Sequence, residues 1–319
     1  MNLAFSISGA RSARDALAWA MEAERLGVSE LWLTEDYCER GSISLLGAIL
    51  ASTSSMVVGV GVINPWTRHP MLIAMELATL IELAPGRVVL GLGASNRRWM
   101  EDELGISYTR PLRVLREATE IIRRALSGGV FNYEGEIFHI QGGLEFEPPA
   151  VVPIVLGVKN PQAMKLAREV ADGVLLPVLA APAYVHSVRS QIRPDQRLMS
   201  YVVFWPEQSG RSERQQLRHL IAEYLGAQGD QATTRAAGID PDKMQAFRAG
   251  WLDGRQRDDL VDDDLVDKLV VAGTPEECAA AFARFQHAQL DTLVVRDDGV
   301  SSPATLISAV SRSWAMLGE

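Results

Sequence analysis

Cysteine is scarce in this 319-residue chain, which has two, Cys38 and Cys278. They lie far apart in the sequence, so we expect neither a disulfide framework nor a cysteine-bound zinc site. No apolar run reaches the length of a membrane span, and basic residues do not cluster in a chain whose net charge is −9. We therefore expect no membrane partner and no nucleic-acid partner.

No secretory leader is predicted either. Met1–Ser8 reads as a β-strand, without a basic start or a small-residue cleavage site. With 47% hydrophobic residues, the chain can fill a large core, either as one α/β barrel or as two smaller domains. The simplest interpretation is a soluble cytoplasmic protein.

Strands and helices are predicted to alternate along the chain, which is typical of βαβ units around a parallel sheet. The predicted strands are Asn2–Ser8, Glu30–Thr34, Ser55–Ile63, Arg87–Leu92, Val152–Leu156, Gly173–Leu176, Leu198–Phe204 and Asp291–Arg296. Eight strands, each with a helix, predict a (β/α)8 barrel, or TIM barrel. An open doubly wound sheet is the competing arrangement, but it needs a glycine-rich phosphate loop after the first strand, where Ser6–Ala10 has one glycine.

Two insertion segments interrupt this single predicted domain of residues 1–319. A hairpin excursion is predicted at about 130–149, and a charged helical insertion at about 211–271. The insertion contains a run of aspartates that could suggest a metal site. These aspartates lack EF-hand spacing, so we interpret them as a solvated face and expect no metal: Asp258, Asp259, Asp262, Asp263 and Asp264.

The stretch Val57–Pro70 combines a buried strand with a polar rim. Gly59 and Gly61 interrupt its β-branched residues, which indicates a bulge or a close approach to the backbone. Asn64 to His69 follow at the carboxyl end of the strand, where a barrel carries its active site. The alternative is a simple turn at Asn64–Pro65 and a helix start at His69–Pro70. The small residues of Gly91–Ser95 are interpreted as space for a flat ligand across the barrel mouth.

The segment Leu156–Gln162 could bind a phosphate. Asn160 can cap the following helix, Gly157 permits close approach and Lys159 supplies positive charge. The alternative is an ordinary strand-to-helix turn. Glu35 and Asp36 follow the second strand, where one carboxyl could act as an acid or base if burial raises its pKa. The alternative for this pair is a solvated surface or a cap for the next loop.

These segments together resemble the bacterial luciferase-like superfamily along essentially the whole chain. One is G-V-I-N-P-W-T-R-H-P at Gly61–Pro70, in which N-P-W-T-R-H-P from Asn64 is the most specific part. Others are E-L-W-L-T-E-D-Y at Glu30–Tyr37, A-P-G-R-V-V-L-G-L-G at Ala84–Gly93, L-G-V-K-N-P at Leu156–Pro161 and G-T-P-E-E from Gly273. The chain is similar to the branch that uses the deazaflavin coenzyme F-420 (F420) and includes methylenetetrahydromethanopterin reductase; FMN-dependent monooxygenases are its sister branch.

The resemblance implies a luciferase-like barrel that forms a homodimer and has a non-prolyl cis peptide at Gly61–Val62. Its activity would be hydride transfer between F420 and a small or medium organic substrate, with a pterin carrier as the leading candidate. Gly61, Val62 and Asn64 would line the coenzyme ring. The phosphate would sit on the turn formed by Gly157, Val158, Lys159, Asn160 and Gln162.

The resemblance is incomplete around the reacting groups. The sugar-phosphate dehydrogenases of this branch have a histidine where this chain has Asp36, and acidic residues near Ser8–Ala10 and Ala94–Asn96 that this chain lacks. We therefore expect another substrate, with Asp36 as proton donor and Glu35 orienting it, Trp66 and Trp99 as pocket walls, and the insertion as a lid. The alternatives are an FMN-dependent monooxygenase and a non-catalytic flavin-binding relative.

Overall fold

The computed structural model describes the backbone of residues 1–207 and 211–318, and the side chains of 1–207 and 214–317. Its centre is a closed barrel in which every neighbouring pair of strands is parallel. In spatial order the strands are β1 (Asn2–Ile7), β12 (Thr292–Val295), β9 (Arg197–Val202), β8 (Gly173–Leu176), β7 (Ile154–Gly157), β4 (Val88–Gly93), β3 (Val57–Ile63) and β2 (Glu30–Leu33). The predicted TIM barrel is confirmed, and the open sheet is excluded.

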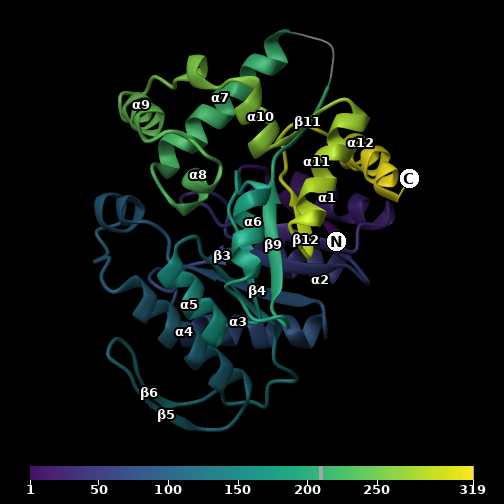
Figure 1. The fold of residues 1–319 in the computed structure, drawn as a ribbon. Coiled ribbons are helices and arrows are strands. Elements are labelled where there is room, and N and C mark those ends of the chain that lie inside the picture. The colour runs from purple at the N-terminus through teal and green to yellow at the C-terminus, as the bar shows by residue number, and fades with distance from the viewer. Residues whose placement is uncertain (208–210, 319) are drawn as a thin grey trace.

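A helix packs outside the barrel after each of these strands (Figure 1). The helices are α1 (Ala13–Arg25), α2 (Ser42–Ser52), α3 (Pro70–Leu83), α4 (Pro111–Leu126), α5 (Pro161–Val170), α6 (Pro182–Arg189), α11 (Pro275–His287) and α12 (Pro303–Ala315). Their starts follow local sequence chemistry. Ser12, Asn160, Thr274 and Ser302 each cap a helix by accepting a backbone N–H, and proline begins six of the eight.

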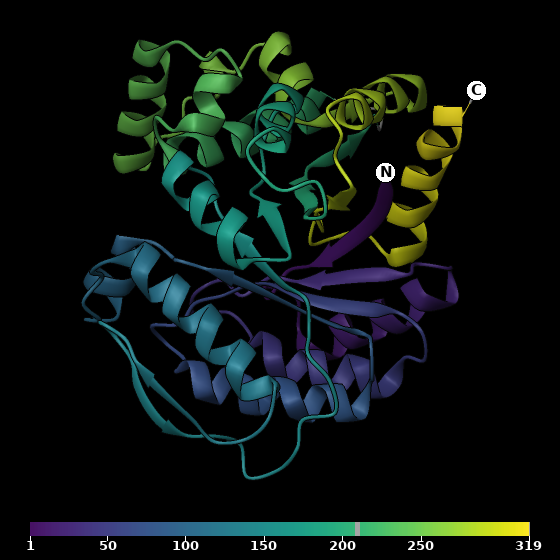
Figure 2. The same cartoon turned by 60° about the horizontal axis from the view of Figure 1, so that its bottom comes forward.

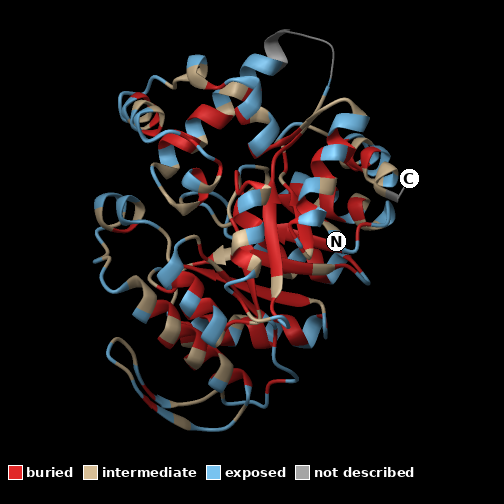
Figure 3. Cartoon of the chain, viewed as in Figure 1, coloured by how far each residue is buried: buried red, intermediate tan, exposed pale blue. Residues whose placement is uncertain are grey.

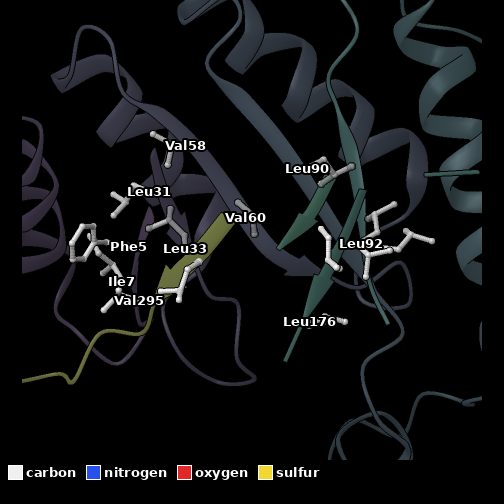
Figure 4. Packing of buried hydrophobic residues seen from close by; sticks show 14 of the residues in the cluster. Phe5, Ile7, Leu31, Leu33, Val58, Val60, Leu90, Leu92, Leu176 and Val295 are labelled. Carbon is white, nitrogen blue, oxygen red and sulfur yellow. The ribbon is translucent and has the colours of Figure 1, made fainter. Parts of the chain in front are cut away.

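Apolar side chains fill the barrel on both sides of the strands, because residues along a strand alternate between its two faces. The interior contains Trp32, Val155, Leu175, Met199 and Tyr201. The larger outer layer lies between strands and helices, and Figure 4 shows part of it, including Phe5, Leu31, Val60 and Leu92. In Figure 3 the strands are accordingly the most continuously buried part of the molecule.

The chain leaves the barrel pattern twice. Strands β5 (Phe131–Glu134) and β6 (His139–Gly142) form an antiparallel hairpin beside α4. Later come α7 (Arg211–Gln228), α8 (Ala232–Ala236), α9 (Pro241–Leu252), η2 (Asp258–Leu260) and α10 (Asp263–Leu269). These helices gather around their own apolar cluster, which includes Leu217, Leu225 and Phe247 (Figures 1 and 2).

The seventh predicted strand, Leu198–Phe204, is two strands in the structure. β9 stays in the barrel, whereas β10 (Phe204–Pro206) pairs with β11 (Val271–Gly273) outside it. The backbone N–H of Val271 donates to the carbonyl of Val203, 2.9 Å away, so the pairing begins where the barrel strand ends. The pairing of β10 with β11 therefore connects the end of the barrel strand β9 to the helical insertion.

The aspartates of the insertion have partners of their own. Four of them pair with surface cations, Asp259 with Arg257, Asp262 with Lys243, Asp263 with Arg218 and Asp264 with Lys268, and Asp258 contacts the ring of His219. Asp262 also caps α10 by accepting the N–H of Leu265. In the described part of the chain, none of the helices combines the length and the apolar character that crossing a bilayer would require.

Candidate active site at the barrel mouth

A cavity of about 310 Å³ opens at the carboxyl ends of β2, β3 and β4. Five residues predicted for the site line it together: Glu35, Asp36, Gly61, Val62 and Asn64. The cavity also reaches Ser95, whose buried hydroxyl oxygen has no partner among the described residues, and Trp99. The structure thus brings the second- and third-strand predictions into one concave site at the end where barrels carry their chemistry.

The floor of the cavity contains the Gly61–Val62 peptide, which is cis as the resemblance implied. The hydroxyl of Tyr201 on β9 donates to the carbonyl oxygen of Gly61 across 3.0 Å. A Cβ at Gly61 would lie 2.5 Å from that hydroxyl oxygen, and a Cβ at Gly59 would lie 2.7 Å from the Trp32 ring. Aromatic side chains inside the barrel therefore require both glycines, independently of any ligand.

Val62 projects into space that three other glycines leave free. A Cβ would lie 2.3 Å from a Val62 methyl carbon if added at Gly93, and 2.8 Å if added at Gly157. At Gly91 it would meet the carbonyl oxygen of Val60 at 2.3 Å. The space beside Gly91 and Gly93 is therefore filled by Val60 and Val62 of β3, whereas Ser95, at the end of the same stretch, lines the cavity.

Asn64 and His69 organise the loop after β3. The Asn64 side-chain oxygen accepts hydrogen bonds from the backbone N–H groups of Trp66 and Thr67, at 3.2 and 3.0 Å. His69 caps α3, with Nδ1 accepting the N–H of Met71. The turn and helix-start alternatives are therefore correct for this loop, although Asn64 still lines the cavity. Trp66 stacks on Tyr108, with ring centroids 5.0 Å apart, and of the two predicted wall residues it is Trp99 that lines the cavity.

Glu35 is held by groups other than Asp36. Its carboxylate pairs with Arg68 at 2.9 Å and accepts bonds from the backbone N–H and hydroxyl of Ser42 at the start of α2. Arg68 also approaches Glu76 of α3. These contacts correct the predicted orienting role of Glu35: it fixes the start of α2 and the loop carrying Arg68.

Asp36 lines the cavity and is an exposed residue. Burial raises the pKa of Asp36 above the ordinary aspartate value. A hydrogen bond from the Thr34 side chain and the positive charge of Arg296 oppose that shift without cancelling it. A carboxyl group with a raised pKa in a cleft is a candidate for proton transfer.

The predicted phosphate turn adjoins the cavity through Gly157, which touches Val62. Asn160 accepts the N–H of Ala163 as the cap of α5, and the exposed Gln162 lies in its first turn. Lys159 is half-buried, and burial lowers its pKa. No acceptor for its ammonium group is present among the described residues. The Val158 side chain packs into the core, which leaves its backbone for any ligand contact.

Three side chains that are electrostatically linked to Asp36 were not predicted from the sequence. Tyr201 comes from β9, Arg296 follows β12, and Tyr224 comes from α7 of the insertion. The Arg296 guanidinium carbon lies 5.5 Å from the centre of the Tyr224 ring. Arg296 could have been found, because it is the last residue of the predicted strand Asp291–Arg296 and strand ends carry barrel active sites. No sequence rule places a tyrosine from a distant helical insertion over it.

The fold and the site define this protein as a (β/α)8-barrel protein with a ligand cavity at the carboxyl ends of its strands. More specifically, it belongs to the luciferase-like monooxygenase family, whose model matches residues 3–292. The family expected from the sequence is confirmed.

The solved structures similar to this chain include both F420-dependent enzymes and monooxygenases. The 5,10-methylenetetrahydromethanopterin reductase of Archaeoglobus fulgidus is 28% identical over 270 residues, covering 80% of this chain and 81% of the relative. An F420-dependent glucose-6-phosphate dehydrogenase of Nakamurella multipartita is 33% identical over 147 residues, covering 44% and 43%. The structure of the F420-dependent tetrahydromethanopterin reductase of Methanopyrus kandleri superposes with a TM-score of 0.82 at 20% identity, covering 98% of this chain and 96% of that one.

Proposed function

We propose that this protein is an oxidoreductase that transfers a hydride between coenzyme F420 and a small or medium organic substrate. The observation that carries the proposal is the similarity to a methylenetetrahydromethanopterin reductase over four-fifths of both chains. The glucose-6-phosphate dehydrogenase relatives match only about half of the chain. A pterin carrier is therefore the first substrate to test.

The residues at the barrel mouth fit this coenzyme chemically. Lys159 offers a half-buried ammonium beside the first turn of α5, whose free N–H groups attract anions. We assign the phosphate to the turn of Gly157, Val158, Lys159, Asn160 and Gln162. The ring would lie against Gly61 and Val62, with Asn64 at its polar edge. When bound, F420 supplies the hydride chemistry, and the protein supplies position and electrostatics.

Asp36 is our candidate proton donor to the substrate. It lies in the same cavity as Gly61 and Val62, and its raised pKa keeps a larger protonated fraction than an ordinary aspartate has. Glu35 contributes indirectly, through Arg68 and the start of α2. We also propose that the helical insertion, residues 211–271, covers this cavity as a lid and limits which substrates enter.

Titration of the purified protein with each coenzyme tests the proposal. We expect saturable quenching of protein fluorescence by F420, followed by turnover with a pterin or another acceptor. The family's description as monooxygenases makes reduced FMN the matched alternative. Oxygen consumption with FMN and no F420 binding would contradict the proposal, and F420 binding without turnover with any acceptor would favour a non-catalytic relative.

Cys38 is a built-in probe of where the coenzyme binds. It lines the cavity and is exposed, whereas Cys278 is buried and burial raises its pKa to about 11. A maleimide should therefore label Cys38 first, since the thiolate is the reactive form. We expect F420 to slow this labelling, and Cys38→Ser to abolish it. Binding that leaves the labelling rate unchanged would place the coenzyme elsewhere.

We propose a homodimer formed through α2 and α3. The exposed side of α3 carries Leu72, Met75 and Leu83, and that of the adjacent α2 carries only small residues such as Ala48 and Ala51. Exposed apolar side chains on α3 next to an uncharged surface of small residues on α2 are suited to a two-fold interface. Light scattering should give a dimer that Leu72→Glu converts to a monomer. The same change at exposed Leu252, on α9, is the control, and a monomeric wild type would end the proposal.

A cytoplasmic location completes the proposal. The two cysteines are free, which suits a reducing compartment. Cell fractionation tests it, and recovery of the protein outside the cytoplasmic fraction would contradict it.

A further inference from the structure

Three tyrosine hydroxyls donate to backbone carbonyl oxygens at the carboxyl-terminal ends of barrel strands. Each acceptor lies in one of these strands or within two residues of its end. The pairs are Tyr201 with Gly61 at 3.0 Å, Tyr184 with Lys159 at 2.9 Å and Tyr108 with Ser95 at 3.3 Å. Two of these acceptors, Gly61 and Lys159, belong to the proposed coenzyme site.

Tyr184 connects helix α6 to the turn after β7. Its ring packs in the apolar layer between strands and helices and is only 4% exposed. Burial raises the pKa of Tyr184 to about 12, so the hydroxyl stays protonated and remains a donor near neutral pH. Strands β7 and β8 are neighbours in the barrel, which brings α6, the helix after β8, next to this turn. The position of the Lys159 carbonyl therefore depends on a side chain from the following strand–helix unit.

The carbonyl held by Tyr184 belongs to the same peptide group as the backbone N–H of Asn160. A trans peptide group is planar, and its C=O and N–H bonds point in opposite directions. Holding the carbonyl therefore also fixes the direction of that N–H. Among the described residues, the backbone N–H groups of Asn160 and Gln162 have no acceptor. Free N–H groups beside the half-buried ammonium of Lys159 are suited to bind an anion.

Tyr201 holds the floor of the cavity through a contact of the same kind. Its ring lies in the barrel interior, and its hydroxyl donates to the carbonyl of Gly61, a residue of the cavity floor. A Cβ at Gly61 would lie 2.5 Å from the hydroxyl oxygen, so this approach requires a glycine. Burial raises the pKa of Tyr201, and this hydroxyl also stays protonated. The two tyrosines thus hold different parts of the site.

We propose that Tyr184 and Tyr201 are positioning residues with separate roles. Tyr184 fixes the turn that binds the phosphate of the coenzyme, and Tyr201 fixes the floor on which the coenzyme ring lies. Each acts through the backbone carbonyl that it holds. The inference rests on the proposed function for the identity of the ligand, F420, but the two carbonyl contacts do not depend on that identity.

Two ligands separate the two roles. F420 carries both ring and phosphate, whereas the deazaflavin riboside ends before the phosphate. Tyr184→Phe removes only a hydroxyl, and it should weaken F420 binding about threefold to tenfold, as expected for one hydrogen bond, while the riboside affinity stays unchanged. Tyr201→Phe should weaken the binding of both ligands by the same factor. Fluorescence titration of wild type and both variants with each ligand measures these dissociation constants.

Tyr133→Phe is the matched control for loss of a tyrosine hydroxyl. The Tyr133 hydroxyl donates to Glu120 of α4 across 2.7 Å, and neither residue lines the cavity. Both affinities should therefore stay at their wild-type values in this variant. A purely structural role would lower stability without changing the ratio of the two affinities. Equal losses for both ligands in Tyr184→Phe, a loss confined to F420 in Tyr201→Phe, or no loss in either variant would overturn the inference.

Hydrogen–deuterium exchange of the coenzyme-free protein tests the same contacts without F420. Tyr184→Phe should speed amide exchange in peptides that cover residues 157–164, and Tyr201→Phe should do so in peptides that cover residues 60–64. Such local changes in a protein that binds neither ligand would support the positioning roles and reject the proposed function. F420 binding by wild type, together with unchanged exchange at both segments in the variants, would support the function and overturn the inference.

Discussion

The two ends of the barrel differ in how their charged side chains are paired. At the amino-terminal ends of the strands, Arg197 pairs with Glu30 and donates to the hydroxyl of Thr292 at 3.0 Å. The second oxygen of Glu30 accepts the indole N–H of Trp32 at 2.8 Å. Each member of this partly buried network has a partner, which is what low dielectric surroundings require for stability.

At the carboxyl-terminal ends, the pairing is incomplete. Lys159 and Arg296 are half-buried cations without a carboxylate or carbonyl acceptor among the described residues, and Asp36 keeps a raised pKa despite the nearby arginine. Such groups cost folding free energy unless something binds them. We call the amino-terminal ends of the strands the lower end of the barrel and the carboxyl-terminal ends the upper end. The contrast indicates that the charged groups of the lower end stabilise the fold, whereas those of the upper end are available to a ligand.

Removing a charge from the lower network should have the largest effect on stability. Arg197→Met leaves Glu30 largely buried beside Trp32 without its cation, and breaking a buried ion pair in this way costs about 3–5 kcal/mol. Urea unfolding measures the loss, and F420 affinity at a temperature where the variant is folded should be unchanged. A stability loss below about 1 kcal/mol is typical of a surface pair. It would show that the Arg197–Glu30 network does not stabilise the fold more than an exposed ion pair does.

Lys159→Ala tests the opposite behaviour at the upper end. F420 affinity should fall by roughly tenfold to a hundredfold, because a charge-assisted hydrogen bond contributes about 1.5–3 kcal/mol. The free energy of unfolding should stay the same or rise, since the ammonium has no acceptor to lose. Lys165→Ala, which removes an exposed lysine from the following helix α5, is the matched control. Unchanged affinity in Lys159→Ala would rule out the phosphate contact.

Gly93→Ala tests whether Val62 explains the glycines of β4. The new methyl would lie 2.3 Å from a Val62 methyl carbon, and overpacking of this kind costs about 1–3 kcal/mol. Val62→Ala should relieve the clash, so the double variant should be more stable than Gly93→Ala alone. If the double variant is no more stable than Gly93→Ala, contact with Val62 is not the reason for a glycine at position 93.

Much of the upper end was predictable from the sequence, and the exceptions share a cause. Asp36, Gly61 and Val62 were found because strand ends and interrupted strands are local patterns, and the family resemblance added the cis peptide. The partners of Glu35 and the aromatic rings that exclude a Cβ at Gly59 and Gly61 could not be found, because they lie far away in the sequence. Tyr224 was hidden for the same reason, since its place depends on how a whole insertion packs.

The pH dependence of stability gives the smallest and most direct test of the upper end. The folded pKa of Asp36 is raised above its ordinary value of 3.8, so the folded state binds its proton more tightly than the unfolded state does. Stability should therefore fall as the pH rises from the unfolded pKa through the folded pKa. Asp36→Asn removes this penalty, so the free energy of unfolding of the variant should exceed that of wild type near pH 7. The difference should disappear below pH 3.8.

Asp195→Asn is the contrasting control. Arg193 lowers the pKa of that exposed aspartate, so removing its carboxylate should bring no gain in stability at pH 7. An Asp36→Asn variant less stable than wild type near neutral pH would mean that the carboxylate is well paired in the folded protein, and the upper end would then resemble the lower one.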